Sequence, residues 1–130
     1  MNYDRVNVSS GGPYEATIGY SRAVRVGPHV WVSGSTAMTA QGLVGSGDAH
    51  AQAVQAIRTI EAALRQVGGS LENVVRTRMF VTDIRNGDAV GRAHGEYFGA
   101  IRPAATMVEI ARLIDPGMLV EIEAEAYLAP

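Results

Sequence analysis

The segment DAHAQAVQAIRTIEAALRQV, residues 48–67, predicts the longest helix of the chain. Asp48 has a side chain suited to the N-cap, and Gly68-Gly69 provide a C-terminal stop. Apolar residues recur at helical spacing and form one stripe: Ala53, Ile57, Ile60, Leu64 and Val67. Polar residues occupy the other faces of the helix: Gln52, Gln55, Arg58, Glu61 and Arg65. Such a helix is expected to bury its stripe against a second layer of structure.

Strand-like segments lie on both sides of this helix. The segment VVRTRMFVTD, residues 74–83, follows it, and a second helix is expected over residues 89–100, with Asp88 as its N-cap and Pro103 blocking its continuation. Further strands are expected at residues 5–9, 21–26, 29–35, 105–111 and 119–127, and a glycine-rich loop at residues 39–47. Two helices with a mixed sheet predict an α+β fold, a single domain over residues 1–130, with the helices on one face of the sheet.

The composition excludes several classes of chemistry. The 130 residues carry 11 basic and 13 acidic side chains, all the basic ones are arginine, and there is no cysteine. Disulfides, thiolate zinc sites, lysine Schiff bases and Walker-type phosphate loops are therefore excluded. A net charge of −2 makes nucleic acid an unlikely partner, because phosphate neutralisation needs a basic surface. The N-terminal residues contain no apolar signal segment and no stretch is long enough to span a membrane, so a cytoplasmic protein is expected.

Residue parity sorts the strand side chains onto two faces of the sheet. The set expected to meet the helices is mostly apolar: Val75, Thr77, Met79, Val81, Thr106, Val108, Ile110, Val120, Ile122, Ala124 and Ala126. The opposite set is mixed: Arg76, Arg78, Phe80, Met107, Glu109, Glu121, Glu123 and Glu125. This second face is either solvated with scattered ion pairs or covered by a second subunit; its apolar members favour a subunit contact.

Six segments, in order along the chain, carry a family resemblance: GYSRAV (19–24), VSG (32–34), VRTRMFVTD (75–83), RPA (102–104), VEIARL (108–113) and VEIEA (120–124). Together they resemble the RidA/YjgF family of reactive-intermediate deaminases, whose members are also labelled endoribonuclease L-PSP or translation inhibitor. The resemblance runs from about Tyr14 to Tyr127. It implies a chorismate-mutase-like fold and a homotrimer with clefts between neighbouring subunits.

The resemblance also implies a reaction and a site. Deaminases of this family hydrolyse imines and enamines, such as 2-aminoacrylate, to a keto acid and ammonia, without a metal or another cofactor. By the resemblance, Tyr20, Ser33, Gly34 and Glu121 line the cleft, with Glu121 as the catalytic carboxylate that positions the water. Active deaminases carry an arginine for the substrate carboxylate where this chain has Ala105, which puts the usual activity in doubt.

Two arginines are candidates to replace the missing cation as substrate-binding residues. Arg78 shares its strand face with Phe80; the alternative is an ion pair with Glu121 or Glu123 that braces the trimer. Arg22 lies beside Tyr20 at the expected rim of the cleft; the alternative is an exposed strand arginine. Arg102 is treated as a loop residue.

The histidines do not predict a metal site. His94 and Glu96 form an H-x-E pair, but zinc deaminases also need cysteine ligands, which this chain lacks. His29, His50 and His94 lie in three different predicted elements and have no ligand spacing.

The sequence therefore leaves three candidate functions. The first is a RidA-like protein that binds a small, anionic metabolite in an inter-subunit cleft and hydrolyses an imine or enamine to a carbonyl compound and ammonia. The second is a non-catalytic small-molecule binder or regulator with the same cleft. The third and weakest is an endoribonuclease, because the chain has neither a basic stripe nor a histidine pair.

Overall fold

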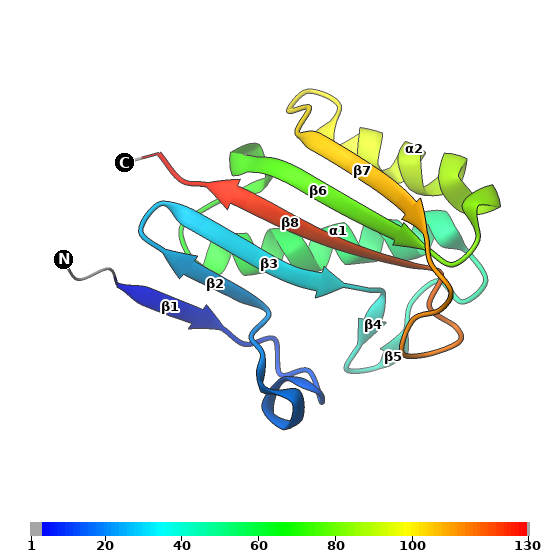
Figure 1. The fold of residues 1–130 in the computed structure, drawn as a ribbon, viewed down its shortest axis with the longest axis horizontal. Helices are drawn as coiled ribbons and strands as arrows, with labels where there is room; N and C mark the ends of the chain where they lie inside the picture. The colour runs from blue at the N-terminus through cyan, green and yellow to red at the C-terminus, as the bar shows by residue number, and fades with distance from the viewer. Residues whose placement is uncertain (1–3, 130) are drawn as a thin grey trace.

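A computed structural model describes residues 4–129 and shows one six-stranded sheet. Along the sheet, β1 (Arg5–Val8), β2 (Ala23–Val26), β3 (His29–Ser35), β8 (Val120–Tyr127), β6 (Val74–Val81) and β7 (Ala104–Glu109) lie side by side (Figure 1). Neighbouring strands are antiparallel except β6 and β7, which are parallel. The sheet is therefore mixed, as predicted. Residues 1–3, where the sequence shows no apolar signal, lie outside the described residues.

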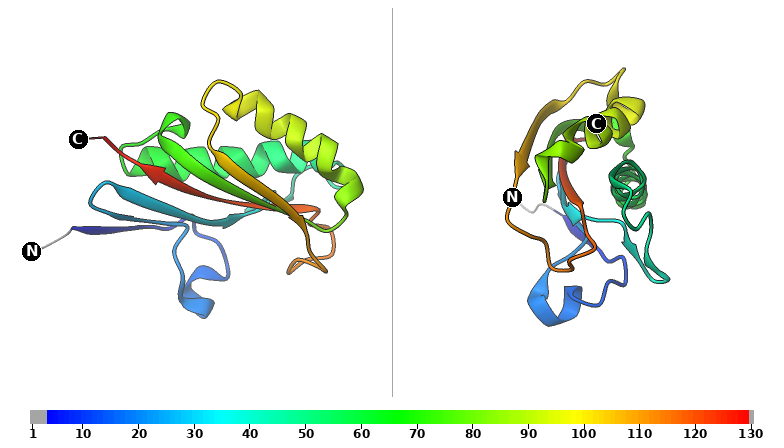
Figure 2. Two further views of the ribbon diagram at one scale, coloured as in Figure 1. Left: turned by 45° about the horizontal axis from the view of Figure 1, so that its top comes forward. Right: turned by 90° about the vertical axis from the view of Figure 1, so that its right-hand side faces the viewer.

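Two helices, α1 (Ala49–Gln66) and α2 (Gly87–Phe98), pack on the same face of the sheet (Figure 2). This arrangement confirms the α+β class and the chorismate-mutase-like architecture. The interior between the two layers contains the predicted stripe of α1 and the even-numbered residues of β8, such as Ile57, Leu64 and Ile122, none of which is exposed. No helix in residues 4–129 combines the length and the apolar character needed to cross a bilayer.

The ends of α1 follow the predicted capping. The Asp48 carboxylate accepts a hydrogen bond from the backbone N–H of Ala51 at 3.0 Å, and Gly68 follows the helix with a φ of +86°, a conformation that favours glycine. Gln52, predicted on a polar face, is instead fully buried. Its amide donates to the carbonyls of Gly45 (3.2 Å) and Gly117 (3.0 Å) and accepts from the N–H of Leu119 (2.8 Å), so it joins two loops to the helix.

The parity prediction holds for β8 but is wrong at Val75 in β6 and along β7. Val75 is 52% exposed, because a register shift between Val74 and Arg76 turns Val74 toward the helices instead. In β7 the two faces are exchanged. The parallel register pairs Met107 with the buried Met79, so Met107 packs against the core, whereas Val108 pairs with Phe80 and is 42% exposed.

Three local predictions also need correction. Residues 39–47 are not wholly loop, because β4 (Met38–Thr39) and β5 (Gly42–Leu43) form a small ribbon. The helix α2 starts at Gly87, directly after a short turn at Ile84–Asn86, so Asp88 lies in its first turn and is not the N-cap. A one-turn helix at Glu15–Gly19, which the sequence did not predict, lies between β1 and β2.

Candidate active-site cavity

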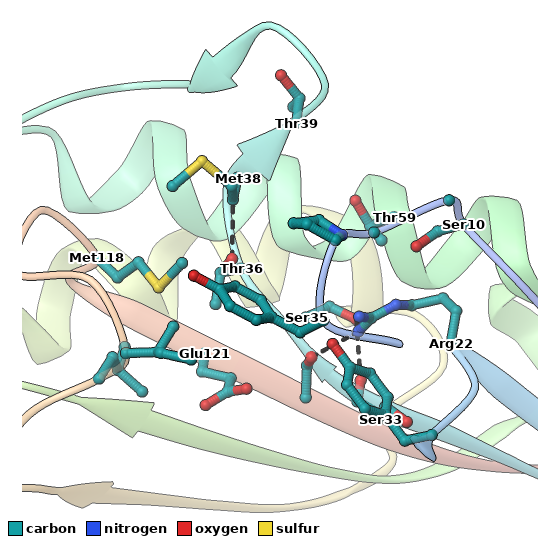
Figure 3. Close-up of a pocket in the computed structure, with 18 of the residues that line it drawn as sticks. Ser10, Arg22, Ser33, Ser35, Thr36, Met38, Thr39, Thr59, Met118 and Glu121 are labelled. Carbon is teal, nitrogen blue, oxygen red and sulfur yellow. Dashed lines mark hydrogen bonds between the residues drawn. The ribbon is translucent and has the colours of Figure 1, made fainter. Parts of the chain in front are cut away.

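A cavity of about 860 Å³ opens at the end of β3 and β8, below the uncovered face of the sheet. Its walls come from the segment of residues 10–22, the end of β3, the β4 ribbon, two side chains of α1 and the loop before β8 (Figure 3). Residues far apart in the sequence therefore meet here. Five of the six predicted site residues line it: Tyr20, Arg22, Ser33, Gly34 and Glu121.

An irregularity in β3 shapes the centre of this cavity. The pairing of β3 with β8 shifts register between Val32 and Ser35, so Ser33 and Gly34 lie in a bulge. The Ser33 hydroxyl donates a 2.6 Å hydrogen bond to the carbonyl of Ser21, and the Ser35 hydroxyl donates to the Ser33 carbonyl at 2.9 Å. The first bond joins the bulge to the segment before β2, and the second lies within the bulge.

Glu121 lies against Gly34 in this bulge. A Cβ on Gly34 would come within 2.6 Å of the Glu121 Cδ, so a larger residue at position 34 would displace the carboxylate from its present position. Burial raises the pKa of Glu121 above its usual value; the positive charge of Arg22 opposes this shift and the negative charge of Glu123 adds to it. A carboxylate with a raised pKa in a cavity is suited to general acid–base chemistry.

Arg22 supports the bulge from the other side (Figure 3). One guanidinium nitrogen, Nη1, donates to the Gly34 carbonyl at 2.6 Å and to the Ser35 hydroxyl at 3.3 Å. The guanidinium carbon lies 5.6 Å from the centroid of the Tyr20 ring, a cation–π distance. Its Nε is buried and has no hydrogen-bond partner in the described part of the chain. Arg22 is thus a bracing residue of the cavity and not an exposed strand arginine.

Arg78 lies outside the cavity lining, on the open face of the sheet. Its Nη1 donates to the carboxylates of Glu123 at 3.1 Å and Glu125 at 3.0 Å, and these hydrogen bonds raise the pKa of Arg78 further above its usual value. The bracing alternative involved Glu121 or Glu123, and Glu123 is one of the two partners present. A binding role for Arg78 stays a prediction.

His94 of α2 and Ala105 of β7 both lie next to Thr77 of β6, and neither lines the cavity. The Nε2 of His94 is 2.8 Å from the hydroxyl of the fully buried Thr77, and its ring packs on Phe98. Burial lowers the pKa of His94. Ala105 pairs with Thr77 in the sheet and is exposed. Among residues 4–129, no cluster of three or more histidine, aspartate or glutamate side chains could hold a metal ion.

The sequence did not reveal the apolar wall of the cavity. This wall comes from loops, the one-turn helix and the small ribbon, and its residues are Tyr14, Ile18, Met38, Leu113, Ile114 and Met118. Loop residues have no periodicity that would place them on one face, so no sequence signal could have found the set. Glycine-rich loops flanking the strands were the only hint.

Comparisons with known proteins show the family of this chain. The family model described as Endoribonuclease L-PSP matches residues 13–128. The chain belongs to the RidA/YjgF family. A member of the RutC family from Pyrococcus abyssi is 34% identical over 109 residues, which are 83% of this chain and 85% of that protein. An uncharacterized protein of Streptomyces coelicolor is 42% identical over 120 residues, which are 92% of this chain and 90% of that one.

Two solved structures have the same fold. Rv2704 of Mycobacterium tuberculosis, a member of the YjgF/YER057c/UK114 family, is 52% identical, with a TM-score of 0.87 over 96% of this chain and 100% of that chain. PA3499 of Pseudomonas aeruginosa is 33% identical, with a TM-score of 0.85 over 98% of this chain and 94% of that chain. The predicted family and fold are therefore confirmed.

Proposed function

We propose that this RidA/YjgF protein binds a small metabolite in the cavity and hydrolyses an imine or enamine to a carbonyl compound and ammonia. The observation that carries the proposal is the Glu121 carboxylate, held against Gly34 in a cavity large enough for a metabolite, with its pKa raised by burial. A group of this kind takes a proton from water and returns it to a leaving nitrogen near neutral pH.

The proposed reaction needs only one proton carrier. A water molecule attacks the carbon of a protonated imine while Glu121 takes a proton from that water. Glu121 then protonates the nitrogen of the resulting carbinolamine. The C–N bond breaks with its electron pair on nitrogen, the hydroxyl proton passes to the departing ammonia, and a carbonyl compound and ammonium are released. An enamine enters the same sequence after protonation of its β-carbon.

We also propose the homotrimer that the family resemblance implies, with the cavity completed at a cleft between subunits. The uncovered face of the sheet supports it: Trp31 is 46% exposed and Tyr127 is 48% exposed on that face, beside the Arg78 ion pairs. Light scattering at micromolar concentration should give three times the chain mass. A monomer mass would contradict the trimer and the inter-subunit cleft.

An anionic metabolite, as the resemblance suggests, needs a cation in the cleft. Arg22 is the one arginine that lines the cavity in residues 4–129, and Arg78 is the other candidate.

A cytoplasmic location of the protein also stays a prediction.

Two alternatives remain distinct from hydrolysis. A non-catalytic binder would keep the cavity and its ligand but release no ammonia. An endoribonuclease would need contacts to phosphates, and the cavity offers one arginine against two glutamates, Glu121 and Glu123.

Ammonia release from 2-aminoacrylate and from simple imines tests the proposal. We expect acceleration over the spontaneous rate for at least one imine, and a loss of at least about tenfold in Glu121→Gln. Glu72→Gln is the control, because Glu72 is exposed and does not line the cavity. No acceleration with any imine, together with ligand binding, would favour the non-catalytic binder; salt-sensitive RNA binding would favour the nuclease.

A further inference from the structure

The charges around the cavity do not favour an anion. The charged side chains that line it are one arginine, Arg22, and two glutamates, Glu121 and Glu123. The lining therefore has a net negative charge when both carboxylates are ionised. Protonation of Glu121 would bring it only to neutrality.

Arg22 does not present two free, accessible donors side by side: of its guanidinium nitrogens only Nη2 is neither hydrogen-bonded within residues 4–129 nor buried without a partner. Carboxylates bind most tightly to two parallel N–H donors of one guanidinium. In Arg22, Nη1 is already bonded to the Gly34 carbonyl and the Ser35 hydroxyl, and Nε is buried. Redirecting Nη1 to a ligand would release the bulge that holds Gly34 against Glu121.

Arg78 cannot supply the missing cation from its present position. Its Nη1 lies between Glu123 and Glu125 at 3.1 and 3.0 Å, so one positive charge is shared by two negative ones. The position that would carry the deaminase arginine is Ala105, which has no polar side-chain atom.

One wall of the cavity is apolar and open. Ile18 and Ile114 are each 63% exposed, and Met38 is 37% exposed, so a bound apolar group would remove them from water. In Figure 3, Met38 and Met118 lie on the same side of the cavity as Glu121, away from Arg22. A ligand can therefore place its apolar part against Met38 and Met118 and its reacting atom beside Glu121.

From these observations we infer that the substrate is an imine without a carboxylate, of the kind formed from a primary amine with an apolar substituent. This inference rests on the proposed function and departs from the anionic metabolite expected from the family resemblance. A protonated imine is a cation, so ionised Glu121 and Glu123 favour it, whereas they repel the carboxylate of an imino acid. The apolar wall receives the substituent, and no free guanidinium is required.

Three probes that share a phenyl group test the charge preference: 2-phenylethylamine, phenylacetamide and phenylacetate. Each is titrated calorimetrically at pH 7 into the full chain in its native oligomeric state, so any group supplied by a neighbouring subunit takes part. We expect the amine and the amide to bind at least tenfold more tightly than phenylacetate, and the amine to lose that advantage in Glu121→Gln. Ethylamine should bind at least tenfold more weakly than 2-phenylethylamine, because it cannot reach the apolar wall. Glu72→Gln, at an exposed residue outside the cavity, should behave as wild type.

A kinetic experiment separates this inference from the proposed function. A flavin amine oxidase acting on 2-phenylethylamine and an amino-acid oxidase acting on phenylalanine generate two imines that differ by one carboxylate. Faster ammonia release from the first imine supports the inference. Equal or faster release from the imino acid, or phenylacetate binding as tightly as the amine, overturns the inference and leaves the hydrolase intact. Selective amine binding without acceleration of either imine supports the ligand class and overturns the hydrolysis; no binding and no acceleration overturns both.

Discussion

Gly34 and Glu121 fit together so closely that a methyl group on the glycine would lie 2.6 Å from the carboxyl carbon of the glutamate. The glycine is held from behind by the 2.6 Å hydrogen bond from Arg22 to its carbonyl. Glu121 therefore has a defined position in the cavity, and its environment raises its pKa. The proposed chemistry depends on this pair more than on any other contact.

Gly34→Ala should displace the Glu121 carboxylate. We expect imine hydrolysis to fall at least about tenfold, because catalysis by a positioned base is sensitive to small displacements. The free energy of unfolding should fall by about 1 kcal/mol, the low end for an inserted methyl group, since the glutamate side chain can rotate away. Gly91→Ala is the control, because a Cβ at Gly91 in α2 meets open space and should stabilise the helix by about 1 kcal/mol. Wild-type activity in Gly34→Ala would show that the position of Glu121 does not matter.

The Glu121 carboxyl should contribute more to the free energy of unfolding at low pH than at pH 7. Its pKa is raised in the folded chain, so the folded state binds more protons than the unfolded state between the two pKa values. The contribution of this carboxyl to stability is present below the unfolded pKa and is lost as pH rises through the folded pKa. Glu121→Gln should therefore raise the melting temperature relative to wild type at pH 7 but not at pH 3. The opposite pattern in thermal melts would mean that the folded chain stabilises the charged carboxylate.

In the inter-subunit cleft proposed above, Ala105→Arg should improve the handling of substrates that carry a carboxylate, although Ala105 does not line the cavity of its own subunit. The exposed position tolerates a long side chain, and a charge-assisted hydrogen bond is worth about 1.5–3 kcal/mol, or roughly tenfold or more in rate. Ammonia release from 2-aminoacrylate should be weak or absent in wild type and should increase in the variant. Robust turnover of 2-aminoacrylate by wild type would show that another group already holds the carboxylate.

Arg78→Ala tests the two roles of that arginine. If it only braces the sheet face, the variant should lose little stability, because its ion pairs with Glu123 and Glu125 are partly exposed, and cavity ligands should bind as before. Denaturant unfolding and calorimetric titration measure the two effects separately. Weaker ligand binding at unchanged trimer mass would instead make Arg78 a site residue. Arg85→Ala is a suitable comparison, because Arg85 forms an exposed ion pair with Asp83.

Gln52→Leu should destabilise the loops around the cavity. The variant leaves the carbonyls of Gly45 and Gly117 and the N–H of Leu119 without their partner. We expect the free energy of unfolding, measured in urea, to fall by about 2–4 kcal/mol. Gln66→Leu, at the exposed end of α1, should change stability by less than about 0.5 kcal/mol. Equal stability of the two variants would show that the buried amide is not needed.

The sequence by itself determined the α+β class, both main helices, the six sheet strands and the family. Local signals were enough for these features, because the stripe of α1, the cap at Asp48 and the alternation in β8 each depend on neighbouring residues. The family segments also indicated five of the residues that line the cavity. The same local signals failed where the pairing of strands, and not the alternation of apolar and polar residues, decides which face of the sheet a side chain lies on. A bulge exposes Val75, and the parallel register with β6 sets the faces of Met107 and Val108.

Only the tertiary structure decided which groups are free to act. Arg22 and Arg78 have the same charge and both lie in or beside strands, yet one holds a backbone bulge and the other lies between two glutamates. The buried role of Gln52 and the apolar wall from Ile18 to Met118 depend on loops that meet across 100 residues of chain. These arrangements arise from long-range packing and hydrogen bonds, which have no periodic signature in a sequence.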